Sequence, residues 1–130
     1  PITHDNRIVL TKQFRYLNKK FSWEFPGGGI KKGTDSLTNA RKELEEETGY
    51  FSDNLIKIGI FNPFNGVTDE ICNVFIAKEL IISEIKPDAS EEFEIALFNK
   101  LQIETMISNN EIWDGMTLAV WSLFKYSKYF

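Results

Sequence analysis

Residues 26–50 read PGGGIKKGTDSLTNARKELEEETGY, a glycine-rich turn that runs into a segment rich in glutamate. On an α-helix each residue advances by about 100° around the axis, so Glu43, Glu46 and Glu47 share one face. Glu45 falls roughly 160° away from Glu43 and is left out of this face. Clustered carboxylates repel one another, and a hard divalent cation would relieve that repulsion. The segment therefore indicates a metal site on a helix.

The plain alternative is that these glutamates form only a solvated helix face, as most charge runs do. The flanking residues favour a more firmly placed helix. Leu37, Ala40 and Leu44 follow the i, i+3, i+7 spacing of a buried stripe. We therefore expect one side of the helix to pack against the core and the acidic side to remain polar.

The ends of this helix are also marked in the sequence. Asp35 or Ser36 can cap its start, and Gly49 can end it in a left-handed conformation. The glycines before it permit close approaches that side chains would forbid. The sequence thus predicts a short helix over residues 35–48, placed directly after a turn that can lie against other groups.

At this point the segment resembles the Nudix box, written G-x5-E-x7-R-E-U-x-E-E-x-G-U, where U is apolar or aromatic. The residues in register with it are Gly28, Glu43, Leu44, Glu46, Glu47, Gly49 and Tyr50. Two positions depart from the pattern: Thr34 stands at the first Glu, and Lys42 stands at the Arg. In the family these two residues support the loop and the helix. The resemblance therefore implies intact metal-binding carboxylates with weakened positioning, because lysine lacks the planar fork of arginine.

The rest of the chain predicts strands mixed with helices. We expect strands at residues 7–12, 22–25, 55–61, 70–80 and 93–98, and helices at 35–48, 101–108 and 114–126. This order predicts an α/β (α+β) fold in which helices cover a mixed β-sheet. The Nudix resemblance implies the same outline, an α/β/α sandwich. We expect a single domain over residues 1–130, with an upstream segment missing before Pro1.

Composition excludes several classes of function. The formal net charge of −4 argues against a general nucleic-acid surface, which needs a basic patch. No apolar run is long enough for a membrane span. The single cysteine, Cys72, excludes an internal disulfide and fits a reducing cytoplasm. Its apolar neighbours predict that Cys72 is a buried small side chain.

Two segments outside the box resemble the ADP-ribose pyrophosphatase branch of the family. Residues 13–15 (QFR) and 23–28 (WEFPGG) are similar to its Q-[YFI]-R and W-E-[FL]-P-x-G segments. In that branch the arginine contacts substrate phosphate, and the resemblance implies this role for Arg15. Residues 62–70 are similar to its P-G-x-[ST]-[DE]-E loop, with two extra residues, and Glu70 is carried over as a substrate or metal contact. The alternative for Arg15 and Glu70 is an ordinary exposed charge.

The resemblance also implies the composition of the site. The metal, Mg²⁺ or Mn²⁺, would be held by the carbonyl of Gly27 and the carboxylates of Glu43, Glu46 and Glu47. The general base would be one of the box carboxylates or a carboxylate of the second acidic cluster, Glu91 or Glu92. Glu94 alternates with apolar neighbours, and we expect it to point to solvent.

The implied function is hydrolysis, with a divalent metal, of the pyrophosphate bond in a nucleoside diphosphate linked to another moiety. The favoured substrate is ADP-ribose or a related nucleoside diphosphate sugar. The alternatives are a nucleoside triphosphate pyrophosphohydrolase, a nucleotide-sensing module without catalysis, and an interaction domain whose acidic helix is only solvated. The expected partner is a small nucleotide, and a homodimer stays open.

Overall fold

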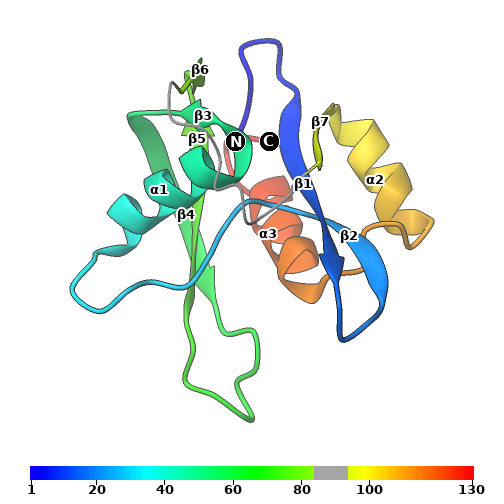
Figure 1. Ribbon diagram of the computed structural model, residues 1–130. Helices are drawn as coiled ribbons and strands as arrows, with labels where there is room; N and C mark the ends of the chain where they lie inside the picture. Colours follow the sequence, from blue (N-terminus) through cyan, green and yellow to red (C-terminus); the bar gives the residue numbers. More distant parts are fainter. Residues whose placement is uncertain (84–93) are drawn as a thin grey trace.

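The computed structural model describes residues 1–83 and 94–130, which contain seven strands and three helices (Figure 1). The strands are β1 (Ile8–Arg15), β2 (Lys20–Glu24), β3 (Tyr50–Phe51), β4 (Asn54–Phe61), β5 (Cys72–Lys78), β6 (Ile81–Ile82) and β7 (Glu94–Phe98). The helices are α1 (Ser36–Thr48), α2 (Lys100–Ser108) and α3 (Gly115–Lys125). Every segment expected from the sequence is present. The additional strands, β3 and β6, are too short to leave a periodic pattern.

The strands pair in three sets. The largest has the order β2-β1-β7, and the other two are β4-β5 and β3-β6. The strand pairs in the described residues are all antiparallel. The mixture of sheet and helix confirms the α+β class that the order of elements predicts.

The residues before β1 connect two of these sheets. The backbone N–H of Val9 donates to the carbonyl of Pro1 (3.1 Å), and the N–H of Ile2 donates to the carbonyl of Ala77 on β5 (2.8 Å). The first two residues thus lie between β1 and β5. This link joins the start of β1 to the end of β5.

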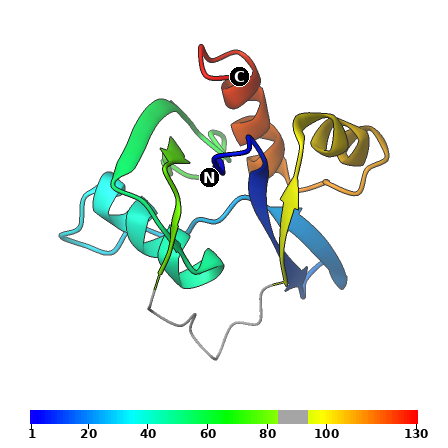
Figure 2. The ribbon, with the colours of Figure 1, turned by 90° about the horizontal axis from the view of Figure 1, so that it is seen from above.

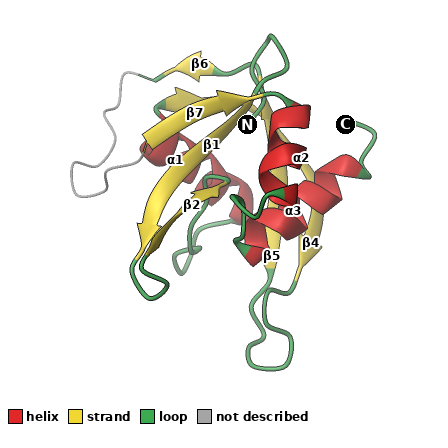
Figure 3. Cartoon of the chain, turned by 90° about the vertical axis from the view of Figure 1, so that its right-hand side faces the viewer, coloured by secondary structure: helices red, strands yellow, loops and turns green. Residues whose placement is uncertain are grey.

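Helices lie on both sides of the strands. Helix α1 contacts β1, β3 and β5, whereas α3 contacts β4. Figures 2 and 3 show α2 and α3 together on the side of the strands away from α1. The packing of α3 on β4 is close at Gly59, where an added Cβ would lie 3.2 Å from the side chain of Leu123. This arrangement is the expected sandwich.

The main core lies between β1, β5 and the two C-terminal helices. Its buried members are Ile8, Leu10, Ile76, Ile103, Met106, Ile112, Trp121 and Phe124. Trp121, Phe124 and Phe130 meet edge to face, with ring centroids 5.2–5.7 Å apart. Helix α1 contributes nothing to this cluster, so it is held mainly by other contacts.

The ends of α1 form as expected. The Asp35 carboxylate accepts hydrogen bonds from the N–H groups of Leu37 and Thr38, both at 3.0 Å, and Gly49 ends the helix with φ of 67°. The predicted buried stripe is wrong at Leu37, which is 38% exposed, while Leu44 is buried. Leu37 lies in the first turn, and the preceding residues 31–33 are exposed as well. That end of the helix therefore lies beyond the strands that cover Leu44.

We predict that Ile103→Ala lowers the free energy of unfolding by about 2–5 kcal/mol, because Ile103 is 1% exposed and its loss leaves a cavity. Leu101→Ala is the matched control on the same helix, since Leu101 is 73% exposed. It should change the stability by less than about 0.5 kcal/mol. Urea unfolding of both variants measures the difference. Equal losses would show that α2 does not pack on the core as described.

Candidate active site

A cavity of about 400 Å³ lies between the glycine-rich turn, α1, the β4-β5 hairpin and the start of α3. The charged residues that line it in the described part of the chain are Arg15, Glu24, Glu43, Glu70 and Asp114. Apolar side chains of β4 and α3, among them Ile58, Phe61, Met116 and Val120, line another part. The cavity therefore joins one arginine and several carboxylates to an apolar wall.

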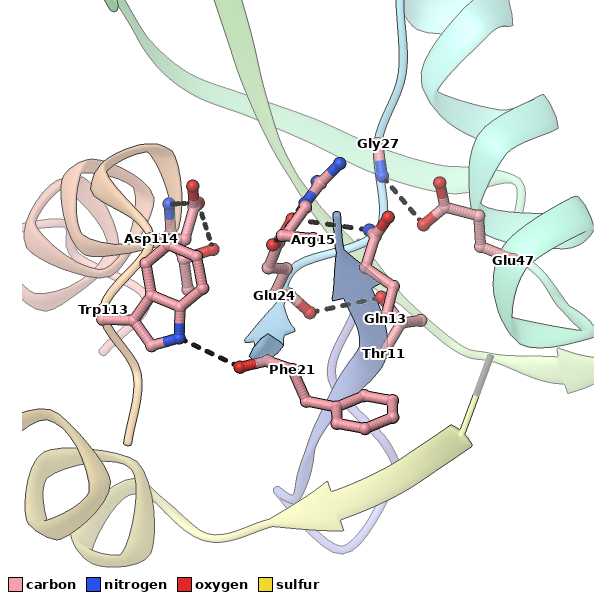
Figure 4. Close-up of polar contacts among 10 residues, drawn as sticks. Thr11, Gln13, Arg15, Phe21, Glu24, Gly27, Glu47, Trp113 and Asp114 are labelled. Carbon is pink, nitrogen blue, oxygen red and sulfur yellow. Dashed lines mark hydrogen bonds and ion pairs between the residues drawn. The ribbon is translucent and has the colours of Figure 1, made fainter. Parts of the chain in front are cut away.

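Arg15 reaches this cavity because of the register of β1 and β2. Thr11 pairs with Glu24 across the two strands. Side chains at every second position of a strand point to the same face, so Thr11, Gln13 and Arg15 share one face of β1. The Arg15 Nε donates to Glu24 Oε1 at 2.8 Å, and its Nη2 donates to Glu24 Oε2 (Figure 4). Gln13 Nε2 donates to the same Oε2 at 3.4 Å. The hydrogen bonds that Arg15 donates to the Glu24 carboxylate raise the pKa of Arg15 further above its ordinary value.

The glycine-rich turn lies directly against α1. The N–H of Gly27 donates to Glu47 Oε2 at 3.3 Å (Figure 4), and Glu47 is only 7% exposed. A Cβ added to Gly28 would lie 2.5 Å from Glu43 Oε2. A side chain at position 28 would therefore have to displace the Glu43 carboxylate.

Asn39 is a supporting residue that the sequence reasoning missed. It is buried on α1, and its Nδ2 donates to the carbonyl of Gly28 at 3.3 Å. The available signal was the spacing, because Asn39 precedes Glu43 by four residues and Glu46 by seven, which places it on the acidic face of the helix. Asn39 therefore fastens the glycine turn to the helix.

Lys42 contacts a carboxylate of its own helix. Its Nζ forms an i,i+4 ion pair with Glu46, and the two side chains are 43% and 41% exposed. The neighbouring Arg41 is directed elsewhere, with Nε donating to the Ser52 carbonyl at 3.1 Å and Nη2 3.6 Å from Asp53.

The three expected metal-binding carboxylates come from one helix, but they do not converge in this structure. Glu43 and Glu47 lie against the glycine turn, while Glu46 is held by Lys42. Within residues 1–83 and 94–130, no three acidic, cysteine or histidine side chains are arranged to hold a metal ion. The donor chemistry fits a hard divalent cation, because carboxylate and carbonyl oxygens are the ligands it prefers. Binding would require Glu46 to leave Lys42.

Glu70 and Cys72 lie together on the wall of the cavity. Glu70 is exposed, and its carbonyl accepts a hydrogen bond from Asn62 Nδ2 at 2.9 Å. The expectation of a buried Cys72 is wrong, because this residue is half-buried and lines the cavity at the start of β5. Partial burial, with a smaller effect of Glu70, raises the pKa of the Cys72 thiol. The thiol is therefore protonated at neutral pH.

The remaining predicted acidic residues divide into two groups. Glu91 and Glu92 lie outside the described residues. Glu94 is exposed as expected, and its Oε2 accepts a hydrogen bond from Lys12 Nζ at 2.9 Å. This ion pair lies on the face of β1 opposite Arg15, away from the cavity.

Asp114 is the N-cap of α3, and it also lines the cavity. Its carboxylate accepts from the N–H of Thr117 at 2.7 Å, and its negative charge contributes to the raised pKa of Arg15. The preceding Trp113 fixes this segment, because its Nε1 donates to the Phe21 carbonyl at 3.0 Å (Figure 4). Sequence alone could not pair the start of α3 with β2.

The family model of the NUDIX domain matches residues 2–114. The chain is 35% identical over 121 residues to "ADP-ribose pyrophosphatase" of Bacillus subtilis (strain 168), covering 89% of this chain and 64% of that protein. It is 34% identical over 122 residues to "Methanol dehydrogenase activator" of Bacillus methanolicus, covering 90% of this chain and 64% of that protein. The chain thus spans slightly less than two thirds of either relative.

A solved structure described as "Crystal structure of ADP compounds hydrolase" matches with a TM-score of 0.85 and 15% identity, covering 95% of this chain and 68% of that one. This likeness shows the fold. Separately, none of the helices in the described residues is long and apolar enough to cross a membrane. The family match over most of the sequence, together with the box on α1, shows that this chain belongs to the NUDIX domain family.

Proposed function

We propose that this protein hydrolyses the pyrophosphate bond of a nucleoside diphosphate linked to a second moiety. The observation that carries the proposal is the cavity that joins Arg15, the Glu43 carboxylate of α1 and an apolar wall. An apolar wall suits a base or sugar, and a cation beside clustered carboxylates suits a phosphate–metal complex. ADP-ribose is the substrate we favour, because the name of the Bacillus subtilis relative is ADP-ribose pyrophosphatase.

The metal in this proposal is Mg²⁺ or Mn²⁺, held by the carbonyl of Gly27 and by Glu43, Glu46 and Glu47. When bound, such an ion neutralises phosphate charge and lowers the pKa of a coordinated water. The Gly27 N–H already orients Glu47 through the 3.3 Å hydrogen bond. The backbone of the glycine turn therefore lies beside the carboxylates of Glu43 and Glu47.

The other residues bind the substrate and move one proton. Arg15 donates charge-assisted hydrogen bonds to a phosphate oxygen. A carboxylate, either in the box or at Glu91 or Glu92, takes the proton from the attacking water. The water oxygen bonds to one phosphorus as the bridging P–O bond breaks, which yields a nucleoside monophosphate and the phosphorylated second moiety. Glu70, at the wall of the cavity, contacts that moiety or the metal.

The partner in this proposal is a small nucleotide, and the compartment is the cytoplasm, which the single cysteine supports. A nucleoside triphosphate stays the competing substrate. A second candidate function has a specific observation in its favour: the Lys42–Glu46 ion pair occupies one of the proposed metal ligands. This would suit a module that binds a nucleotide without hydrolysing it. Assembly into a homodimer stays a prediction.

The first test is release of AMP or phosphate from ADP-ribose, other nucleoside diphosphate sugars, dinucleoside polyphosphates and deoxynucleoside triphosphates, each with and without Mg²⁺. We expect cleavage of ADP-ribose only when the metal is present, because the carboxylates alone repel the diphosphate. If nothing in the panel is cleaved while Mg²⁺ still raises the melting temperature, the binding module is the correct function.

We predict that Glu47→Gln abolishes turnover, because the amide keeps the shape of the side chain but loses the charge that binds the metal. Glu45→Gln is the matched control, since Glu45 lies on another side of the same helix and accepts a hydrogen bond from Ser83. The control should keep its activity. Retention of more than about a tenth of the activity by Glu47→Gln would contradict the assignment, since a lost metal ligand costs several kcal/mol.

A further prediction concerns the cation that competes with the metal. Lys42→Gln should tighten Mn²⁺ binding by about two- to tenfold, because it releases Glu46 and removes a positive charge near the ion. Titration calorimetry with Mn²⁺ measures this directly. Lys31→Gln, a charge removed from the exposed loop before α1, is the control and should leave the affinity unchanged. Weaker binding by Lys42→Gln would show that Lys42 supports the site.

A further inference from the structure

Glu24 is a buried carboxylate that the proposed reaction does not use. Its side chain is 6% exposed, and it lines the cavity at the end of β2. It receives two N–H groups of Arg15 and one N–H of Gln13. A buried carboxylate is costly to desolvate, and an apolar residue of similar size often gives equal or greater stability. Its presence beside the arginine of the cavity therefore calls for a role other than stability.

The geometry of the contact indicates that role. Two N–H groups from one guanidinium on the two oxygens of one carboxylate fix the plane and the direction of the guanidinium. The Nη1 of Arg15 has no hydrogen-bond partner in the described residues, so this edge is available to a ligand. Gln13, two residues before Arg15 on the same face of β1, steadies the Glu24 carboxylate.

Other charges show why the arginine needs such an anchor. Asp114 and Glu47 both act on Arg15 electrostatically, and they come from α3 and α1, two elements that bound the same cavity. The Arg15 side chain is 45% exposed, so packing alone does not immobilise it. Without Glu24 the guanidinium could turn toward Asp114 or toward the carboxylates of α1. In either direction it would lie away from a fixed phosphate position.

We infer that Glu24, steadied by Gln13, is a positioning residue that orients Arg15 toward a phosphate of the bound nucleotide. The inference rests on the proposed function only in requiring a phosphate-bearing ligand in this cavity. It does not require that the ligand be cleaved. Glu24 acts through Arg15, so its contribution must disappear when Arg15 is absent.

A double-mutant cycle tests this dependence. The probe is α,β-methylene-ADP, whose phosphates cannot be hydrolysed at the bridging position, bound in the presence of Mg²⁺ and measured by titration calorimetry. Glu24→Gln should weaken binding by about ten- to a hundredfold, the range for a charged hydrogen bond. Arg15→Ala should weaken it at least as much. The double variant should bind no more weakly than Arg15→Ala alone.

The control is Glu94→Gln, the same substitution in the exposed Lys12–Glu94 ion pair on the other face of β1. Its affinity should equal that of the wild type. Glu24→Asp keeps the charge but shortens the side chain, so it should weaken binding while the protein remains folded, as circular dichroism would verify. This variant carries the test if Glu24→Gln fails to fold.

Three outcomes would overturn the inference. They are unchanged binding in both Glu24 variants, additive losses in the double variant, and failure of the wild type to bind the probe. Additive losses would mean that Glu24 acts on the fold and not through Arg15. The substrate panel tests a separate point. If the double-mutant cycle gives the expected result in a protein that cleaves no substrate of the panel, the positioning role of Glu24 stands and the hydrolase function is rejected.

Discussion

The close approach of the glycine-rich turn to α1 is the constraint on which the site depends. The Gly28 Cα lies so near the Glu43 carboxylate that a Cβ would be 2.5 Å from its oxygen. The Gly27 N–H and the Gly28 carbonyl are each used by a side chain of the helix, Glu47 and Asn39. Because these contacts involve backbone groups, they fix the course of the chain as well as single side chains. The turn thereby leads directly from β2, which carries Glu24, to the acidic helix.

The charges that surround the cavity follow from this arrangement. Four carboxylates and one arginine line it, and the arginine already forms an ion pair with one of the carboxylates. An anionic diphosphate therefore meets a net negative surface, which a metal ion would have to reverse. Electrostatics thus supports the assignment of a metal–nucleotide ligand and disfavours a bare phosphate. It also makes the orientation of Arg15 important, since the cavity has no second cation in the described residues to replace it.

Local sequence signals predicted a large part of this structure. The capping of α1 by Asp35 and Gly49, its acidic face and the strands around it follow from residue spacing and turn chemistry, which act over a few positions. The errors arise where tertiary packing decides. Leu37 has the spacing of a buried residue but lies beyond the strands, and the apolar neighbours of Cys72 did not reveal that it opens onto a cavity. The contacts Arg15–Glu24 and Asn39–Gly28 depend on strand register and loop path, which no local pattern encodes.

The departures from the Nudix box acquire a physical meaning from these contacts. A box supported by an ion pair between its first Glu and its Arg cannot be supported in that way here, because Thr34 and Lys42 occupy those positions. The loop is instead fastened by the Asn39 amide, which donates to the Gly28 carbonyl, and by the Glu47 carboxylate, which accepts from the Gly27 N–H. Lys42 is left to bind Glu46 on the exposed side of the helix. A site built in this way keeps its carboxylates but holds one of them in a competing ion pair. In the proposed metal site this ion pair competes with the metal for Glu46, and an exposed i,i+4 pair is worth only about 0.3–0.5 kcal/mol.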